Sequence, residues 1–497
     1  MLLLVGKKIQ NLTGVNDSAV RRLRKGLDGF VKTVVVECDY ICKDYRSIYS
    51  NFLSKKFTAH NSKCARLHFF SDDGLTVDNV VIESNKCQKA YIGHSVIHPI
   101  VHPDEQGCLG RTVIDPFKCG KEENTFYCLS ATFTASIRGA KYTVNGYPYI
   151  SQSGEATVCA HAAVWNVCRY LSQKYHEYRE IYPYDVITLM GDDTEGRRVP
   201  YRPMRYQNLA RILSEFGCHP VVRRVRSNGD QWHKDAKTYF DIYSYVESGF
   251  PVLMAFPGHV ATAIGHTSRS TLAFEQPDSY GFHSSYALLD QYVVIDDNFF
   301  PYQLLGEQTD TLDRNYGLAF RGDPQSNPSK QTIYSAVVPL PEKAFMEADG
   351  AREIGGKFFG RKHFKDMLTE VIKRTDGDTN DPIIARLLLT SSNSFKHRKR
   401  GSFLRRLDDQ AADTLAELPL MLSMPHFIWL MEISPLRLYN KGFVVGELVL
   451  DASAGPGDYA ILYGRIGNHI AIGNREQVDA NAPECFRLYS HNLGERP

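Results

Sequence analysis

The sequence predicts an α+β protein, in which helices and antiparallel strands form separate runs along the chain. Between about residues 150 and 345, segments with apolar residues three to four positions apart come first, and short strand-like segments follow. The residues before this stretch carry mostly strand signals, and those after it mix helix and strand signals. Helices followed by antiparallel strands are typical of the α+β class.

Length and composition favour a soluble, multidomain, cytoplasmic protein. The 497 residues allow two to four domains, and 43% hydrophobic and 23% charged residues are ordinary for a globular chain. We expect a strand-rich N-terminal domain at 1–150, a central domain at 151–345 and an α+β C-terminal domain of unknown role at 346–497. A net charge of +2 gives no overall field for nucleic acid or for an anionic membrane. The apolar run Met1–Val5 is too short for a signal peptide, and no run could span a bilayer.

Eleven dispersed cysteines, an odd number, indicate reduced thiols in a reducing compartment rather than a disulfide framework. A zinc site is the alternative for one group of residues, namely Cys108, Cys119 and Cys128 with His94, His98 and His102. However, His98 and His102 each precede a proline, which favours extended backbone over a shared helical face. The chain also has no Cys-x-x-Cys pair, so we expect no metal.

The N-terminal region is predicted to be mostly strands, without chemistry of its own. Residues 34–37, 90–100 and 126–136 have strand signals. Residues 67–70 and 76–82 flank an Asp-Gly pair, which predicts a hairpin because the glycine supplies the positive φ of a tight turn. A recognition role and a structural role both remain open for this region.

The central region begins with a cysteine at a predicted helix start. After the polar segment 152–157, the apolar residues of one helical face are Ala160, Ala163, Val164, Val167 and Leu171. Cys159 therefore lies at the helix N-terminus, where unpaired N–H groups and the helix dipole favour a thiolate. The alternative is a packing role, since free cysteines are often buried.

The parts needed for thiol catalysis follow downstream. Helices are predicted at 207–216 and 239–246, each ending near a glycine, and strands at 251–256, 259–265 and 292–295. His259 begins the second of these strands, and Asp296 and Asp297 follow the third. A cysteine hydrolase needs a thiolate, a histidine that moves a proton and an acid or amide that orients the imidazole.

Over about residues 150–305, this order resembles the papain-like cysteine peptidases, most closely the branch that processes bacteriocin leaders at a double glycine. The resemblance rests on Cys159 at a helix start, the segment 247–256, Gly258-His259 on a strand and Asp296 at a strand end. It implies a helix-borne cysteine packed on an antiparallel sheet. It also implies that Gln152 completes an oxyanion hole with the backbone N–H of Cys159.

The sequence departs from the family pattern at two places. Gln152 lies seven positions before Cys159, one more than the family's usual spacing. His259 and Asp296 are 37 positions apart, so a segment around 278–286 must be looped out. A short hairpin would make Glu275 the orienting acid instead. Asp297 is a further alternative, because strand register cannot be fixed from sequence. Residues given a structural role are His161, His266 and Cys168.

The resemblance implies a cysteine peptidase or hydrolase that cleaves a peptide or isopeptide bond without a cofactor or metal. Its partner would be a protein or peptide substrate, not nucleic acid or membrane, and the flanking domains would supply substrate or partner recognition. A papain-fold acyltransferase or transamidase is the second possibility. A catalytically inactive binding module of the same fold is the third.

The C-terminal region mixes helices and strands. A helix is predicted at 358–372 and strands at 427–433, 443–450 and 459–463. The basic runs 396–400 and 405–406 are interpreted as solvated surface. The segment 449–458 resembles the glycine loop of methyltransferases. Because strand-like residues follow it and fewer than fifty residues remain, we interpret it as a β-hairpin loop.

Overall fold

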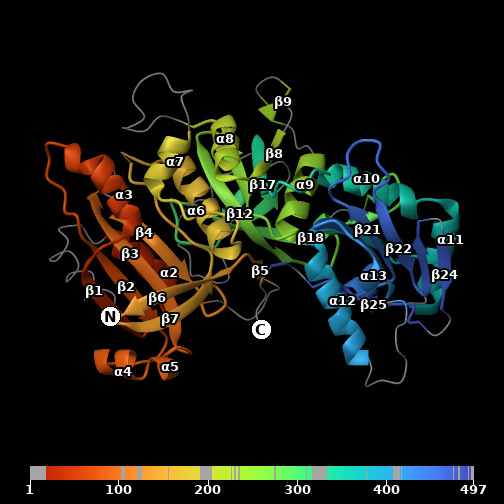
Figure 1. Ribbon diagram of the computed structural model, residues 1–497, viewed down its shortest axis with the longest axis horizontal. Helices are drawn as coiled ribbons and strands as arrows, with labels where there is room; N and C mark the ends of the chain where they lie inside the picture. The colour runs from red at the N-terminus through yellow and green to blue at the C-terminus, as the bar shows by residue number, and fades with distance from the viewer. Residues whose placement is uncertain are drawn as a thin grey trace.

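The chain runs along the long axis of the molecule, from a strand-rich N-terminal part through a central sheet to a C-terminal sheet (Figure 1). The computed structural model describes residues 18–101, 107–119, 126–154, 156–190, 204–224, 227–228, 231–232, 236–273, 276–308, 311–315, 333–375, 378–406, 415, 417–473, 475–479, 482–490 and 492–493. Helices combined with antiparallel sheets confirm the α+β class. Among the described strands, β13 and β18 are the pair that runs parallel.

The N-terminal part contains an antiparallel sheet with the order β1-β2-β3-β4. Its strands are β1 (Thr33–Tyr40), β2 (Cys64–Phe70), β3 (Tyr91–Val101) and β4 (Gly107–Ile114), and a separate hairpin consists of β6 (Ala131–Ile137) and β7 (Ala140–Gly146). The helices of this part are α2 (Ser18–Leu27), α3 (Lys43–Asn51), α4 (Val77–Ile82) and α5 (Ser84–Cys87). The predicted strands at 34–37 and 90–100 are therefore confirmed.

The hairpin predicted at 67–82 is wrong, because residues 77–82 form the helix α4 and β2 pairs with β1 and β3. The reason is a capping box. The Thr76 hydroxyl accepts a hydrogen bond from the Asn79 backbone N–H, and the Asn79 side chain accepts one from the Thr76 N–H, each at 3.2 Å. This pair satisfies two backbone donors that a strand would have used in a ladder.

The central sheet has the order β16-β15-β14-β12-β11-β17-β8, and β5 also pairs with β12. Its strands are β5 (Phe126–Cys128), β8 (His219–Arg224), β11 (Val252–Phe256), β12 (His259–Ser268), β14 (Leu289–Ile295), β15 (Gln303–Gln308), β16 (Thr311–Asn315) and β17 (Ser335–Leu340). The helices are α6 (Cys159–Lys174), α7 (Pro183–Leu189), α8 (Tyr206–Phe216) and α9 (Ala236–Glu247). The helices and strands predicted for this region are confirmed.

Both faces of the central sheet are buried, and the strand alternation separates two cores. On β11, Leu253 and Ala255 join the core that contains α6 and α8, whereas Val252, Met254 and Phe256 join the core that contains α9. The first core also contains N-terminal strands, and the second contains the C-terminal sheet. The three expected regions therefore share cores across the boundaries proposed at 150 and 345.

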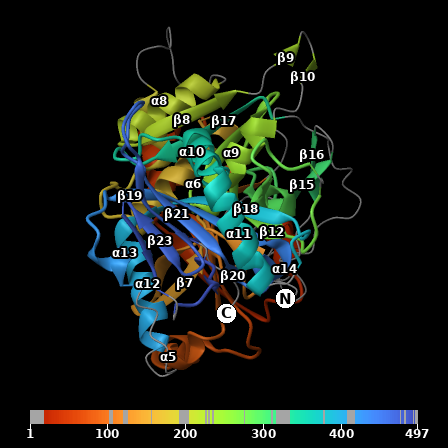
Figure 2. The same cartoon turned by 90° about the vertical axis from the view of Figure 1, so that its right-hand side faces the viewer.

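The C-terminal sheet has the order β13-β18-β19-β21-β22-β23-β24. Its strands are β13 (His283–Ser284), β18 (Ile383–Ser391), β19 (Phe427–Pro435), β21 (Gly446–Asp451), β22 (Ile461–Ile466), β23 (His469–Ile472) and β24 (Arg475–Val478). The helices α10 (Ala348–Phe359) and α11 (Lys362–Thr375) pack on one face, and α12 (Ser392–Arg406) packs on the other (Figure 2). The loop between β21 and β22 is a hairpin loop, as predicted for residues 449–458.

The helix predicted at 358–372 is wrong in its extent, because α10 ends at Phe359 and α11 begins at Lys362. Close packing fixes this break. A Cβ added to Gly356 would lie 2.3 Å from the Tyr280 ring, and one added to Gly360 would lie 2.7 Å from the Gly356 carbonyl oxygen. Tyr280 belongs to the segment between β12 and β14, so this segment packs against the C-terminal part.

A buried ionic network joins α9 and the central sheet to the C-terminal sheet. The Arg386 guanidinium donates to Glu247 at 2.6 Å and to Glu432 at 2.9 Å, and His266 Nε2 lies 2.6 Å from Glu247 Oε2. The Tyr489 backbone N–H donates to Glu432 at 2.7 Å. These contacts fix β18 and β19 against the end of α9.

Two further sequence interpretations concern the basic run and possible membrane spans. In α12, Lys399 pairs with Glu447 at 2.6 Å and the Lys396 ammonium donates to the Leu422 carbonyl at 2.6 Å, so part of this basic segment has protein partners. Within the described ranges, no helix combines the length and the apolar character that crossing a membrane requires.

Candidate active site

Cys159 is the first residue of α6, as the apolar spacing predicts. It is half-buried, whereas the rest of the helix as far as Leu171 is buried against the core that includes β12. Its neighbour His161 is 2% exposed and accepts a hydrogen bond at Nδ1 from the Val158 backbone N–H. Burial lowers the pKa of His161 to about 4, so this imidazole is neutral at pH 7.

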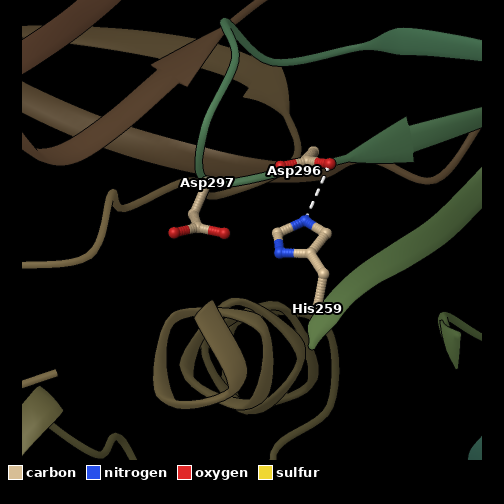
Figure 3. Close-up of side chains that lie close together, drawn as sticks. All are labelled: His259, Asp296 and Asp297. Atoms are coloured by element: carbon tan, nitrogen blue, oxygen red, sulfur yellow. Dashed lines mark hydrogen bonds and ion pairs between the residues drawn. The ribbon is translucent and has the colours of Figure 1, made fainter. Parts of the chain in front are cut away.

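His259 is placed by the hairpin that joins β11 to β12. Phe256 and His259 pair across the ladder, and Pro257 and Gly258 form the two-residue turn between them. Gly258 has a φ of +72°, which an L side chain adopts only with strain, so glycine suits this position of the turn. The His259 side chain is 10% exposed and extends from the strand end toward the residues that follow β14 (Figure 3).

Asp296 follows the last residue of β14, whose pairing with β12 brings the acid to the imidazole. His259 Nε2 lies 2.9 Å from Asp296 Oδ2 (Figure 3). The Asn298 backbone N–H donates to Asp296 Oδ1 at 3.1 Å. Both carboxylate oxygens therefore have a partner, which holds the carboxylate in place. This contact leaves the other ring nitrogen, Nδ1, for a second partner.

The Cys159 side chain also interacts with the His259 imidazole. Burial by itself would lower the pKa of His259, but hydrogen bonds with Asp296 and Cys159 and the negative charges of Asp296 and Asp297 raise it to about 10. The protonated imidazole is therefore favoured at neutral pH. The three side chains form a sequence of contacts from thiol to imidazole to carboxylate.

Asp297 lies beside this triad and differs sharply from Asp296. It is 4% exposed, and neither of its carboxylate oxygens has a hydrogen-bond partner among the described residues. Burial and the neighbouring charge of Asp296 raise the pKa of Asp297 to about 7. Its backbone carbonyl is held firmly, since it accepts from the Tyr149 hydroxyl at 2.9 Å and from Arg22 Nη1 at 3.2 Å.

Gln152 reaches the same site from the segment that precedes α6. Its Nε2 donates to Asn298 Oδ1 at 3.2 Å, two residues after the acid that binds His259. The backbone before it is fixed on β4, because the Ser151 N–H donates to the Leu109 carbonyl at 2.9 Å. The Gln152 amide thus lies where the segment before α6 meets the end of β14.

Comparisons with family models, curated proteins and solved structures found no match to this chain. The chemistry of the site is therefore argued from its geometry alone.

The remaining candidates lie elsewhere. Glu275 is outside the described residues. His266 is 1% exposed and bonds to Glu247 in the buried network, and Cys168 is fully buried inside α6. His94 and His98 lie within β3, while His102 is outside the described residues. The one group of described residues whose donor atoms could together hold a metal ion is His259, Asp296 and Asp297.

Sequence reasoning missed several residues that shape the site. Asn298 links Gln152 to Asp296, and its position directly after Asp296 and Asp297 was the available signal for it. Arg22 and Tyr149, which hold the Asp297 backbone, gave no signal. Tyr334 was also missed. Burial, Tyr206 and the negative charge of Cys159 raise the pKa of Tyr334.

Proposed function

We propose that the chain is a cysteine-dependent hydrolase with a papain-like core, which cleaves a peptide or isopeptide bond. The observation that supports this most is the contact of His259 with Cys159 on one side and with Asp296 on the other. The three residues come from the start of a helix and the ends of two adjacent antiparallel strands. A triad is recognised by such geometry and roles rather than by sequence position.

In the proposed mechanism, Cys159 Sγ attacks the carbonyl carbon of the scissile amide. The Gln152 side-chain amide and the Cys159 backbone N–H stabilise the oxyanion, typically the largest electrostatic contribution in acyl transfer. His259 donates its proton to the leaving nitrogen, which departs as an amine and leaves a thioester. His259 then removes a proton from water, the hydroxide attacks the thioester and the thiolate is released with the acid product.

The test is the rate of thiol alkylation by iodoacetamide at pH 7, read cysteine by cysteine from peptide masses. Cys38 is an exposed cysteine and serves as the internal reference. Although Cys159 is less exposed, we expect it to react at least about tenfold faster than Cys38, because thiolates and not thiols are alkylated. His259→Ala should remove this advantage, whereas His219→Ala, at an exposed position of β8, should keep it.

Equal rates at Cys159 and Cys38 in the wild-type protein would overturn the proposal and favour an inactive binding module. Hydrolysis and transfer differ in the product. In ¹⁸O-labelled water, hydrolysis places one labelled oxygen in the acid product, whereas transfer to an amine adds the mass of the acceptor instead. A product that carries an amine and no label would assign the same triad to a transamidase.

A further inference from the structure

Asp297 has a buried carboxylate that the proposed hydrolysis does not use. It is 4% exposed, and both of its oxygens lack hydrogen-bond partners among the described residues. Its carboxylate lies beside the His259 ring (Figure 3). Burying an ionised carboxylate without a hydrogen-bond partner costs on the order of 1–3 kcal/mol or more. A bound ligand could supply the partner that the Asp297 carboxylate lacks among the described residues.

The charges around Asp297 indicate that this ligand is a cation. One nitrogen of His259 and one oxygen each of Asp296 and Asp297 all lie within 4.8 Å of one another. When both carboxylates are ionised, they leave one negative charge even with the imidazole protonated. Arg22 is close, but its Nη1 donates to the backbone oxygen of Asp297 and not to the carboxylate oxygens, which have no partner among the described residues.

We propose that His259, Asp296 and Asp297 form a binding site for a divalent transition-metal ion, Zn²⁺ in particular, and that the bound ion blocks the catalytic imidazole. One imidazole nitrogen and two carboxylate oxygens match the ligands of zinc, whereas Ca²⁺ and Mg²⁺ favour oxygen ligands alone. Tetrahedral zinc ligands stand roughly 3.4 Å apart, from bond lengths of about 2.0–2.1 Å, so small side-chain rotations close the site.

Three protein ligands leave the fourth position of a tetrahedral zinc ion to a water molecule. On binding, the ion takes the lone pair of a His259 nitrogen and displaces the proton held there, and no electron transfer is involved. A metal-bound imidazole cannot accept or return a proton. The inhibitory consequence rests on the proposed function, whereas the metal site itself does not.

The first experiment measures Zn²⁺ binding by calorimetry to the full chain after treatment with a chelator, in the absence of substrate. We expect one equivalent with a Kd that Asp297→Asn weakens at least tenfold. Asp290→Asn is the matched control, because Asp290 lies on β14 with its side chain 41% exposed and should leave the Kd unchanged within twofold. Equal affinity of wild type and Asp297→Asn would overturn the site.

Two more measurements keep the result independent of folding and of the proposed activity. Co²⁺ is a coloured substitute for Zn²⁺, and its visible spectrum should show four-coordinate binding that Asp297→Asn weakens. His259→Gln should also abolish binding, so the site is tested even if Asp297→Asn fails to fold. Zn²⁺ should slow iodoacetamide labelling of Cys159 at least tenfold and leave Cys38 unaffected; labelling at an unchanged rate would overturn the inhibition.

The two proposals fail in different ways. A protein that binds one Zn²⁺ through Asp297 but shows no enhanced labelling of Cys159 in chelator has the metal site and lacks the hydrolase. A protein with enhanced labelling in chelator but no Zn²⁺ affinity that depends on Asp297 has the hydrolase and lacks the metal site.

Discussion

The substitution Asp296→Asn tests whether a negative charge holds the catalytic imidazole in its protonated form. An amide oxygen in place of Oδ2 can still accept the hydrogen bond that now spans 2.9 Å from His259 Nε2, so the charge is removed while the contact is kept. The amide NH2 group then takes the place of Oδ1 and cannot accept the hydrogen bond from the Asn298 backbone N–H, so this neighbouring contact is lost. The change therefore removes the negative charge while it keeps the contact between the side chain and the imidazole.

The magnitude follows from the pKa of His259. A rise from 6.5 to about 10 corresponds to about 5 kcal/mol in favour of the protonated ring, at about 1.36 kcal/mol for each pKa unit. This stabilisation is fully present below pH 6.5 and is lost as the pH rises through about 10. We expect Asp296→Asn to lower the pKa of His259 by more than one unit, or more than roughly 1.4 kcal/mol. It should also lower the stability at pH 7, and this deficit should disappear above pH 10.

The assay is deuterium exchange at the imidazole C2 position, read by peptide mass spectrometry as a function of pH in chelator-treated protein. His161 is an internal control, since burial places its pKa at about 4 and it does not contact the altered carboxylate. If the titration midpoint of His259 in Asp296→Asn equals that of the wild type, the raised pKa does not originate in this acid. The assigned role of Asp296 would then be refuted.

Three further substitutions test other parts of the structure. Arg386→Ala leaves two buried carboxylates without their shared cation and should cost about 3–5 kcal/mol, seen as a lower urea midpoint of tryptophan fluorescence. Gly265→Ala places a Cβ 2.0 Å from the Tyr127 carbonyl oxygen, so it should lower the Tm by separating β5 from β12. Asp297→Asn should raise the Tm at pH 8 but not at pH 4. The reason is that burial and Asp296 raise the pKa of Asp297 from 3.8 to about 7. Stability is therefore lost progressively between about pH 4 and pH 7, by on the order of 4 kcal/mol at most, and stays lost at higher pH.

Matched controls separate these effects from general damage. Lys357→Ala removes an exposed ion pair and should leave the urea midpoint unchanged, unlike Arg386→Ala. Gly401→Ala adds a Cβ in open space on α12 and should not lower the Tm, unlike Gly265→Ala. An Arg386→Ala midpoint equal to that of Lys357→Ala, or an Asp297→Asn gain that is the same at both pH values, would contradict the reasoning.

Elements with one strongly apolar face were predictable from sequence. The repeat from Ala160 to Leu171 locates α6, and the short apolar runs locate β11, β12 and β14. Local signals that compete with the pattern were harder to weigh. Val80 and its neighbours are β-branched residues that favour a strand, yet the cap formed by Thr76 and Asn79 starts a helix.

The site residues that could be predicted from sequence are those at the ends of helices and strands with an apolar pattern. Cys159, His259 and Asp296 each begin or follow an element whose position the pattern indicates, and the structure brings the imidazole to the carboxylate. Contacts between distant segments carry no local signal. Arg22 reaches a carbonyl 275 positions away, and Gln152 reaches Asn298 across 146 positions, so neither contact follows from spacing.

The pairing of β13 with β18 also determines which fragments of the chain can be expressed as separate, stable proteins. Residues 269–288 connect the strand that carries His259 to the strand that precedes Asp296, and on the way His283 and Ser284 lie along Ile384 and Ala385 of the C-terminal sheet. A fragment that ends at residue 345 would lose this neighbour and expose the sheet face that bears Met254 and Tyr292. We expect such a fragment to aggregate, so substrate screens need the entire polypeptide.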